Sequence, residues 1–155
     1  HHAIEAFAGI VDKFPNLRLK IVGKGSLEKN LRQKAFDYHV ADKVDFEGFK
    51  KDIIPFYLYA NGTILTSIYE GYPNVLAEAC SFGLPIITTN AGDAKVILKD
   101  YPHGCIVDSK EKFLEELLLL KKKTVNQREK VALEFRHRNT FLNTREAYLK
   151  LFKSL

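Results

Sequence analysis

The 155-residue sequence has no tryptophan and no methionine, and its two cysteines, Cys80 and Cys105, form no CxxC pair. They are also not accompanied by histidines at the spacing of a zinc site. This pattern argues against a disulfide framework and against a structural metal, and it is typical of a reducing compartment. A membrane-spanning helix needs about 20 consecutive apolar residues, and no apolar run in the sequence is that long. We therefore expect a cytoplasmic protein without a metal site.

Acidic residues are outnumbered in the C-terminal part of the chain, which carries the excess of positive charge. From Lys110 to the end there are twelve Lys and Arg against six Asp and Glu, in a chain of net charge +5. A basic helical segment could bind anionic lipid, so a peripheral position at the inner face of the membrane is one hypothesis. A solvated helix face with neighbouring Glu and Lys is the commoner explanation. We expect no nucleic-acid partner.

Helical and strand patterns alternate along the whole chain. Apolar residues at helical spacing predict helices over 3–14, 27–38, 52–60, 73–82, 95–98, 110–120 and 127–155. Short apolar runs predict strands over 17–22, 44–46, 62–67, 85–89 and 104–107. This alternation predicts βαβ units and a Rossmann-like, doubly wound parallel sheet with flanking helices. We expect one domain over 1–155, with its C-terminal helices at about 110–155.

No strand pattern precedes the first predicted helix. A Rossmann-like domain usually has its first strand at the centre of the sheet, beside the ligand crevice. We therefore expect the sequence to be the later part of a longer protein, with the first strand outside it.

The segment from Thr66 to Gly83, TSIYEGYPNVLAEACSFG, is the richest in chemistry. Pro73 stands where a helix begins, which leaves the backbone N–H groups of the first turn, in Asn74, Val75 and Leu76, free to bind a phosphate. Gly71 would let a bulky ligand approach the backbone. We therefore predict an anion site at this helix N-terminus.

Two carboxylates flank this helix start. Glu78 is surrounded in the sequence by apolar residues, and a carboxylate there could accept hydrogen bonds from the two hydroxyls of a ribose or sugar. The alternative is a glutamate on the one solvated face of the helix, within reach of a lysine. Glu70, at the turn before the helix, is equally compatible with a simple capping carboxylate. His103, near a turn, is more simply a surface histidine than a catalytic one.

Glu70 and Glu78, with seven residues between them, resemble the E-x7-E signature of family four of the retaining glycosyltransferases, the glycosyl transferases group 1, which have the GT-B fold. The resemblance extends to EGYPNVLAEA, GLPIITT, LRLKIVGKGS and VDFEG, and to the stretch from Asn90 to Ile97. It covers essentially the whole chain. It implies that the chain is the C-terminal, donor-binding half of such an enzyme.

The resemblance implies a role for each matching residue. Glu78 would bind the ribose of the nucleotide, and Glu70, the expected catalytic residue, would contact the donor sugar. Gly71 and the amides of Asn74, Val75 and Leu76 would face the sugar and diphosphate. The remaining positions would border the base or line the floor of the cleft: Gly48, Phe49 and Lys50 for the base, and Gly23 and Gly25 for the floor. Without the family context, Gly23-Lys24-Gly25 indicates only a tight turn.

Two features of the family are absent from this sequence. An Arg and a Lys that neutralise the diphosphate normally stand upstream of this region, and an acceptor-binding N-terminal domain precedes it. The chain alone is therefore expected to be inactive, with the missing domain of the same protein as its partner. The family needs no cofactor, and its substrate here is expected to be a nucleotide sugar, with UDP as the nucleotide.

The function expected from this resemblance is donor binding in a hexosyltransferase that builds polysaccharide, glycolipid or lipid-linked oligosaccharide. Two alternatives remain open at this point. One is a nucleotide-sugar 2-epimerase domain of the same fold, although the stretch Gly92-Asp93-Ala94 fits the transferases better. The other is a non-catalytic module that binds a nucleotide or another protein.

Overall fold

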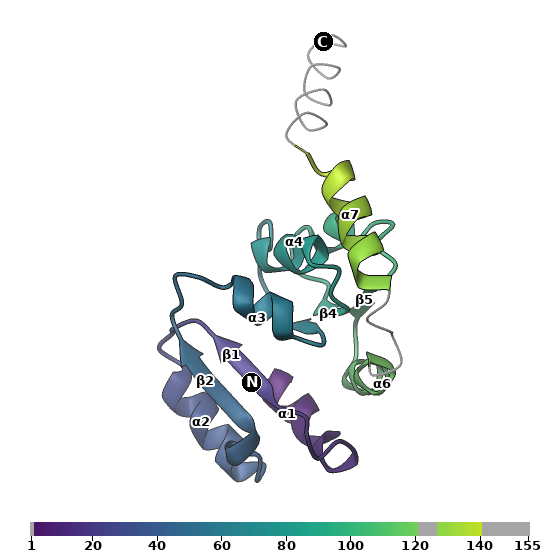
Figure 1. Cartoon of the computed structure of the whole chain (residues 1–155). Coiled ribbons are helices and arrows are strands. Elements are labelled where there is room, and N and C mark those ends of the chain that lie inside the picture. The colour runs from purple at the N-terminus through teal and green to yellow at the C-terminus, as the bar shows by residue number, and fades with distance from the viewer. Residues whose placement is uncertain (1, 121–126, 141–155) are drawn as a thin grey trace.

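The computed structural model describes residues 2–120 and 127–140. Within this part, five parallel strands form a two-stranded and a three-stranded sheet, and helices pack against both (Figure 1). The α-helices and strands follow in the order α1 (His2–Ala8), β1 (Leu19–Val22), α2 (Glu28–Asp37), β2 (Val44–Gly48), α3 (Ile54–Tyr59), β3 (Thr63–Leu65), α4 (Asn74–Ser81), β4 (Ile86–Thr89), α5 (Ala94–Ile97), β5 (Gly104–Val107), α6 (Lys110–Leu120) and α7 (Arg128–Arg138). The predicted class, parallel strands with flanking helices, is confirmed.

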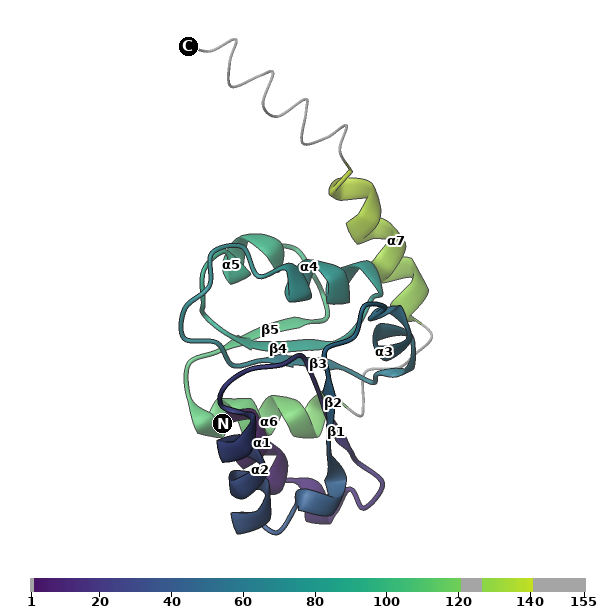
Figure 2. The same cartoon turned by 90° about the vertical axis from the view of Figure 1, so that its left-hand side faces the viewer.

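The three-stranded sheet is covered by helices on both faces, as Figure 2 shows. Its order is β3-β4-β5, so β5 lies at one edge of this sheet in the described part of the chain. On one face Ile86 packs with buried residues of α4, α5 and α7. On the other face Ile87 and Val107 pack with α1 and α6. Apolar side chains on both faces explain why these strands have short apolar runs rather than an alternating pattern.

The two-stranded sheet of β1 and β2 has a different environment on each face. Leu19 and Ile21 pack with α1 and α2 on one face. Arg18, just before β1, and Lys20, between Leu19 and Ile21, lie on the opposite face and pair with carboxylates of β2. This strand therefore alternates between apolar and charged residues, unlike the strands of the larger sheet.

Helix α1 joins the two sheets into one molecule. Its residues Ile4 and Phe7 belong to the core beside β1 and β2, whereas Ala6 belongs to the core beside β4 and β5. All three are almost completely buried, with exposed fractions of 1–3%. Because one short helix is buried on two sides, its face toward each sheet contributes to the stability of both.

The element predictions are confirmed in number and order, with shifted ends. The first helix stops at Ala8 and continues as a 3-10 turn at Val11–Lys13. Two starting residues were wrong, since Leu27 caps α2 and Pro73 caps α4, each preceding the helix that it was predicted to open. The predicted helix over 127–155 is found as α7 up to Arg138, and residues 141–155 lie outside the described residues.

Helix α7 packs on the end of α4. Gly83, which follows α4 with a φ of +67°, allows this contact, because a Cβ atom there would lie 2.0 Å from the carbonyl oxygen of Arg128. Gly83 therefore follows the end of α4 in a conformation that favours glycine, and it also leaves room for the start of α7. No helix in residues 2–120 and 127–140 is both long and apolar enough to cross a membrane.

Candidate functional site

The predicted carboxylate Glu70 lies exposed in the loop between β3 and α4. The Ser67 hydroxyl donates a hydrogen bond to its Oε1 atom at 2.7 Å. The main chain of Ser67 is held in turn, since the Thr89 hydroxyl at the end of β4 donates to the Ser67 carbonyl oxygen. The loop that carries Glu70 is therefore tied to the carboxyl end of the neighbouring strand, where ligands of open α/β sheets bind.

A second loop, after β4, supports the backbone of Glu70 and Gly71. The Asp93 amide donates a hydrogen bond to the Gly71 carbonyl oxygen at 3.0 Å. Gly92 has a φ of +55°, and a Cβ atom there would lie 2.1 Å from the Gly71 oxygen and 2.5 Å from the Glu70 oxygen. Gly71 itself has open space where its side chain would be. The backbone around Gly71 is thus held in place by the loop after β4, while Gly71 itself remains exposed to solvent.

The N-terminus of α4 offers two free amides rather than the three predicted. The Leu76 amide donates to the Pro73 carbonyl oxygen at 2.9 Å, so it is already paired within the protein. The Leu76 side chain is completely buried, with an exposed fraction of 0%. Asn74 is exposed and Val75 half-buried, and their amides make no hydrogen bond within the described part of the chain. The prediction that the Leu76 amide is unpaired was therefore wrong, whereas its part in binding a phosphate stays a prediction.

Glu78 is half-buried, one helical turn along α4 from Asn74. Its Oε2 atom accepts a hydrogen bond of 2.7 Å from the hydroxyl of Tyr57 in α3. Among the described residues no Lys or Arg pairs with it, so the alternative of a surface Glu–Lys pair is not supported. A half-buried carboxylate without a cation has acceptor capacity left for a ligand that brings hydroxyl donors.

Tyr57 and the residues that hold it were not predicted from the sequence. Its ring is buried and stacks on Phe82 with 5.3 Å between the ring centroids. The guanidinium group of Arg128 donates to the carbonyl oxygens of Tyr57, Ala60 and Phe82 at 2.6, 3.0 and 3.1 Å. The aromatic-rich pattern of 52–60 indicated a helix, but nothing local to it indicates which ring faces Glu78.

The predicted glycines at the ends of β1 and β2 come together. The Gly23 amide donates to the Gly48 carbonyl oxygen at 2.8 Å, and Gly25 is exposed nearby along the chain. Phe49 is 70% exposed, so its ring is available to a flat ligand. Lys50 lies over the ring of Phe56 in α3, with its ammonium group 5.8 Å from the ring centroid.

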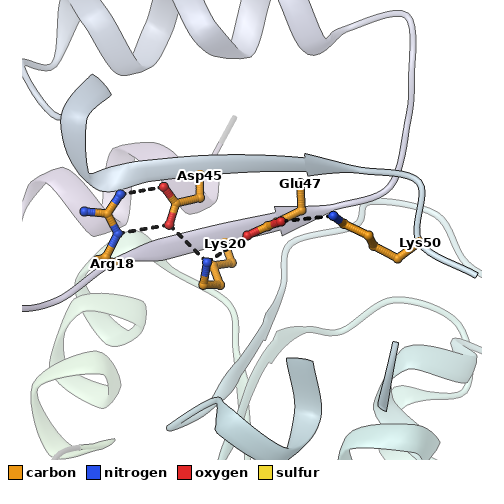
Figure 3. A network of polar contacts seen from close by, with 5 residues as sticks. All are labelled: Arg18, Lys20, Asp45, Glu47 and Lys50. Atoms are coloured by element: carbon orange, nitrogen blue, oxygen red, sulfur yellow. Dashed lines mark hydrogen bonds and ion pairs between the residues drawn. The ribbon is translucent and has the colours of Figure 1, made fainter. Parts of the chain in front are cut away.

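Lys50 also ends a network of charges on the exposed face of β1 and β2 (Figure 3). Its ammonium group lies 3.3 Å from Glu47, which accepts a hydrogen bond from Lys20 at 2.7 Å. Lys20 and Arg18 both bind Asp45, and the bidentate Arg18 contact lowers the pKa of Asp45 to about 2. Lys50 is therefore paired within the protein rather than free for a phosphate.

His103 is not a surface residue. It is buried, with an exposed fraction of 7%, and its Nδ1 atom lies 3.2 Å from the Gly83 carbonyl oxygen. Its ring also meets Tyr101 edge-on. Both interpretations of His103, the exposed one and the catalytic one, are replaced by a role in packing beside the end of α4.

Several curated proteins similar to this chain are named as glycosyltransferases. The lipopolysaccharide core biosynthesis glycosyltransferase LpsE of Rhizobium meliloti is 30% identical over 108 residues, which are 70% of this chain and 31% of LpsE. The chain spans less than half of the length of the curated relatives that it matches.

Solved structures share the fold. HepE of Anabaena, solved in complex with UDP, has a TM-score of 0.78 at 18% identity, with 100% of this chain and 45% of HepE covered. The C-terminal domain of the glycosyl transferase group 1 family protein LpcC of Francisella tularensis has a TM-score of 0.72 at 24% identity, with 89% of this chain and 77% of that domain covered. The family model of the glycosyl transferases group 1 matches residues 1–137. The chain therefore belongs to the glycosyl transferases group 1 family.

Proposed function

We propose that this chain binds the nucleotide-sugar donor of a retaining hexosyltransferase, with Glu78 accepting hydrogen bonds from the ribose and Glu70 contacting the donor sugar. The observation that carries the proposal is the Glu78 carboxylate, which is half-buried, oriented by Tyr57 and unpaired with any cation in the described residues. A vicinal diol, which donates two hydrogen bonds, complements such a group.

The spacing along α4 supports this arrangement. Asn74 and Glu78 are four residues apart, so they share one face of the helix and are separated by about 6 Å along its axis. A nucleotide with its ribose at Glu78 would carry its diphosphate toward the free amides of Asn74 and Val75. The helix N-terminus favours negative charge at that place.

The remaining predicted residues have supporting positions in the same proposal. The base would lie against Gly48, Phe49 and Lys50, with the exposed Phe49 ring as a stacking surface. Gly23 and Gly25 would line the cleft beside them. HepE was solved in complex with UDP, which supports UDP as the nucleotide tested first.

The reaction proposed for the whole protein is transfer of the sugar to an acceptor hydroxyl with retention at the anomeric carbon. Its main requirement is stabilisation of the diphosphate as it leaves, to which the amides of Asn74 and Val75 would contribute. LpsE acts in lipopolysaccharide core biosynthesis, which supports an acceptor that is a glycolipid or polysaccharide. The relatives named as glycosyltransferases favour a transferase over the 2-epimerase alternative.

A further domain that binds the acceptor is part of the proposal. The chain, taken as one donor domain over 1–155, spans 31% of LpsE and 45% of HepE. The arrangement of the two sheets also supports an additional strand. In the described part of the chain, β1 pairs with β2 alone and β3 pairs with β4 alone, so each of them has one edge without a partner strand. A parallel strand between β1 and β3 would join the two sheets into one and satisfy both edges.

Peripheral contact with a membrane is a separable part of the proposal. In α7, Lys130 is 81% exposed in its side chain, whereas Arg128 is engaged inside the protein. Replacing the basic residues between Lys121 and Arg138, other than Arg128, should reduce binding of the full-length protein to vesicles with anionic lipid. Unchanged binding would remove the membrane contact and leave the donor site untouched.

Calorimetric titration tests the proposed function. The chain is titrated with UDP, UDP-GlcNAc and GDP, and the variants Glu78→Ala and Glu115→Ala are compared with it. We expect binding in the millimolar range, weakened about tenfold or more by Glu78→Ala, because a hydrogen bond to a charged group is lost. Glu115, exposed on α6, serves as the matched control. A Glu78→Ala variant that binds like the original chain would contradict the proposal.

A further inference from the structure

The hydrogen bond between Tyr57 and Glu78 joins two elements that are distant in the sequence. Tyr57 comes from α3, which follows β2, and Glu78 lies in the middle of α4. The two oxygen atoms are 2.7 Å apart, and the tyrosine side chain is buried with an exposed fraction of 9%. The hydroxyl is therefore directed at the carboxylate and shielded from most of the solvent.

The direction of this hydrogen bond is fixed by chemistry. Burial, and then the neighbouring Glu78 carboxylate, raises the pKa of Tyr57 well above its usual value. The hydroxyl thus keeps its proton and donates a hydrogen bond to Oε2 of Glu78. The other oxygen, Oε1, accepts no hydrogen bond within residues 2–120 and 127–140. One oxygen is therefore held by the protein and the other is left for a ligand.

We infer that Tyr57 is the positioning residue of the donor site, which fixes the Glu78 carboxylate so that Oε1 faces the ribose hydroxyls. This inference rests on the proposed function. Without the tyrosine hydroxyl, the carboxylate could rotate about the last bond of its side chain, and binding would cost the ordering of that group.

Two contacts keep Tyr57 itself in place. Its ring stacks on Phe82 at an interplanar angle of 13°, which fixes the ring plane. Arg128 donates to the Tyr57 carbonyl oxygen at 2.6 Å and also to the Phe82 carbonyl oxygen at 3.1 Å. The tyrosine that orients Glu78 and the residue on which it stacks are thus bound to one guanidinium group. The hydroxyl can be removed without removing these contacts, because Phe in place of Tyr keeps the ring.

The variant Tyr57→Phe tests the inference with two nucleotides, UDP and 2′,3′-dideoxy-UDP. We expect the Kd for UDP to rise about threefold to tenfold, the effect of one hydrogen bond. The Kd for 2′,3′-dideoxy-UDP, which has no ribose hydroxyls to present to Glu78, should stay the same. A purely structural effect of the substitution would weaken both nucleotides alike, and that result would overturn the inference.

Tyr101→Phe is the matched control. It also removes a buried tyrosine hydroxyl, which donates to the Leu84 carbonyl oxygen at 2.8 Å, and it should leave UDP binding unchanged. In a Glu78→Ala background, Tyr57→Phe should have no further effect on the Kd for UDP. If Tyr57→Phe binds UDP like the original chain while Glu78→Ala does not, the inference fails and the proposed function stands. If the original chain binds no UDP, both fail.

Discussion

Gly92 lies under the backbone of Glu70 and Gly71, at a distance that a larger residue would not allow. A Cβ atom there would be 2.1 Å from the Gly71 carbonyl oxygen, and its φ of +55° disfavours side chains. We expect Gly92→Ala to lower the free energy of unfolding by about 2 kcal/mol. Gly25→Ala, whose Cβ atom would have no other atom within 4 Å, should change the free energy of unfolding far less. Urea denaturation of both variants measures the difference. Equal stability of the two variants would contradict this account of Gly92.

Asp45 gives a residue-scale prediction on pH. Its pKa is lowered from 3.8 to about 2, first by the hydrogen bond from Arg18. A lowered carboxyl pKa stabilises the fold above the unfolded value, and this contribution is lost as the pH falls from about 4 to about 2. Because the pair is partly exposed, we expect Asp45→Asn to cost only about 1 kcal/mol at neutral pH.

Thermal unfolding across that acid range measures the effect. The Asp45→Asn variant should lose less stability than the original protein between pH about 4 and about 2, because it has no carboxyl to protonate. Asp12→Asn, an exposed position outside the network, should follow the original protein. If the stability of Asp45→Asn fell with pH as steeply as that of the original protein, the Asp45 carboxylate would not contribute to the stability of the fold.

The residues of the site differ in how far the sequence could predict them. Glu70 and Glu78 were found through a signature of residue types at fixed spacing, and the structure gives each a defined environment. Tyr57 and Arg128 were not found, because their roles depend on contacts across 21 and 71 positions of sequence. The Leu76 amide was wrongly expected to be unpaired, because its hydrogen bond to Pro73 depends on the residue at which the helix starts.

At the scale of elements, Arg128 fastens α7 to the ends of α3 and α4. Burial lowers the pKa of Arg128, yet its planar group donates to three carbonyl oxygens that have no other donor in the described part of the chain. We expect Arg128→Met to cost about 2–4 kcal/mol, since several partly buried acceptors would lose their partner. Denaturation in urea would measure it.

Lys130→Ala is the control within the same helix. Lys130 and Glu134 form an exposed pair at 4.0 Å, and its loss should cost less than about 0.5 kcal/mol. The free energy of unfolding of Arg128→Lys should lie closer to that of Arg128→Met than to that of the original protein. An ammonium group cannot donate to three carbonyl oxygens as the planar guanidinium group does. If Arg128→Met were as mild as Lys130→Ala, α7 would not be fastened in this way.

The order of helices and strands was predictable because apolar spacing distinguishes one from the other over a few residues. The starting residues of α2 and α4 were not predictable in the same way, because Leu27 and Pro73 cap these helices without a side-chain hydrogen bond. The charged face of β1 was not predicted, because LRLKIV was interpreted as a short apolar run although its first five residues alternate between apolar and charged. Its pairing with Asp45 and Glu47 required the register of the two strands.

At the scale of the whole molecule, the parallel sheet predicted without its first strand is found in the described residues as two sheets, β1-β2 and β3-β4-β5. Strand pairing is set by contacts between distant segments, so the pattern of one strand does not show which neighbour it has. Helix α1, which packs on both sheets, holds them together in this structure.

This arrangement predicts the effect of an additional strand. A longer form of the protein that places a parallel strand between β1 and β3 should unfold at a higher urea concentration than this chain. Amides of β1 and β3 should also exchange more slowly with solvent in the longer form. Unchanged exchange at both strands would contradict the proposed position of the strand.

The crystal structure of the chain with UDP is the most direct measurement of the central claim. We predict the ribose hydroxyls at Glu78, with its Oε2 still bound to Tyr57, and the diphosphate at the amides of Asn74 and Val75. A nucleotide bound elsewhere, or a ribose turned away from Glu78, would contradict the donor site described above.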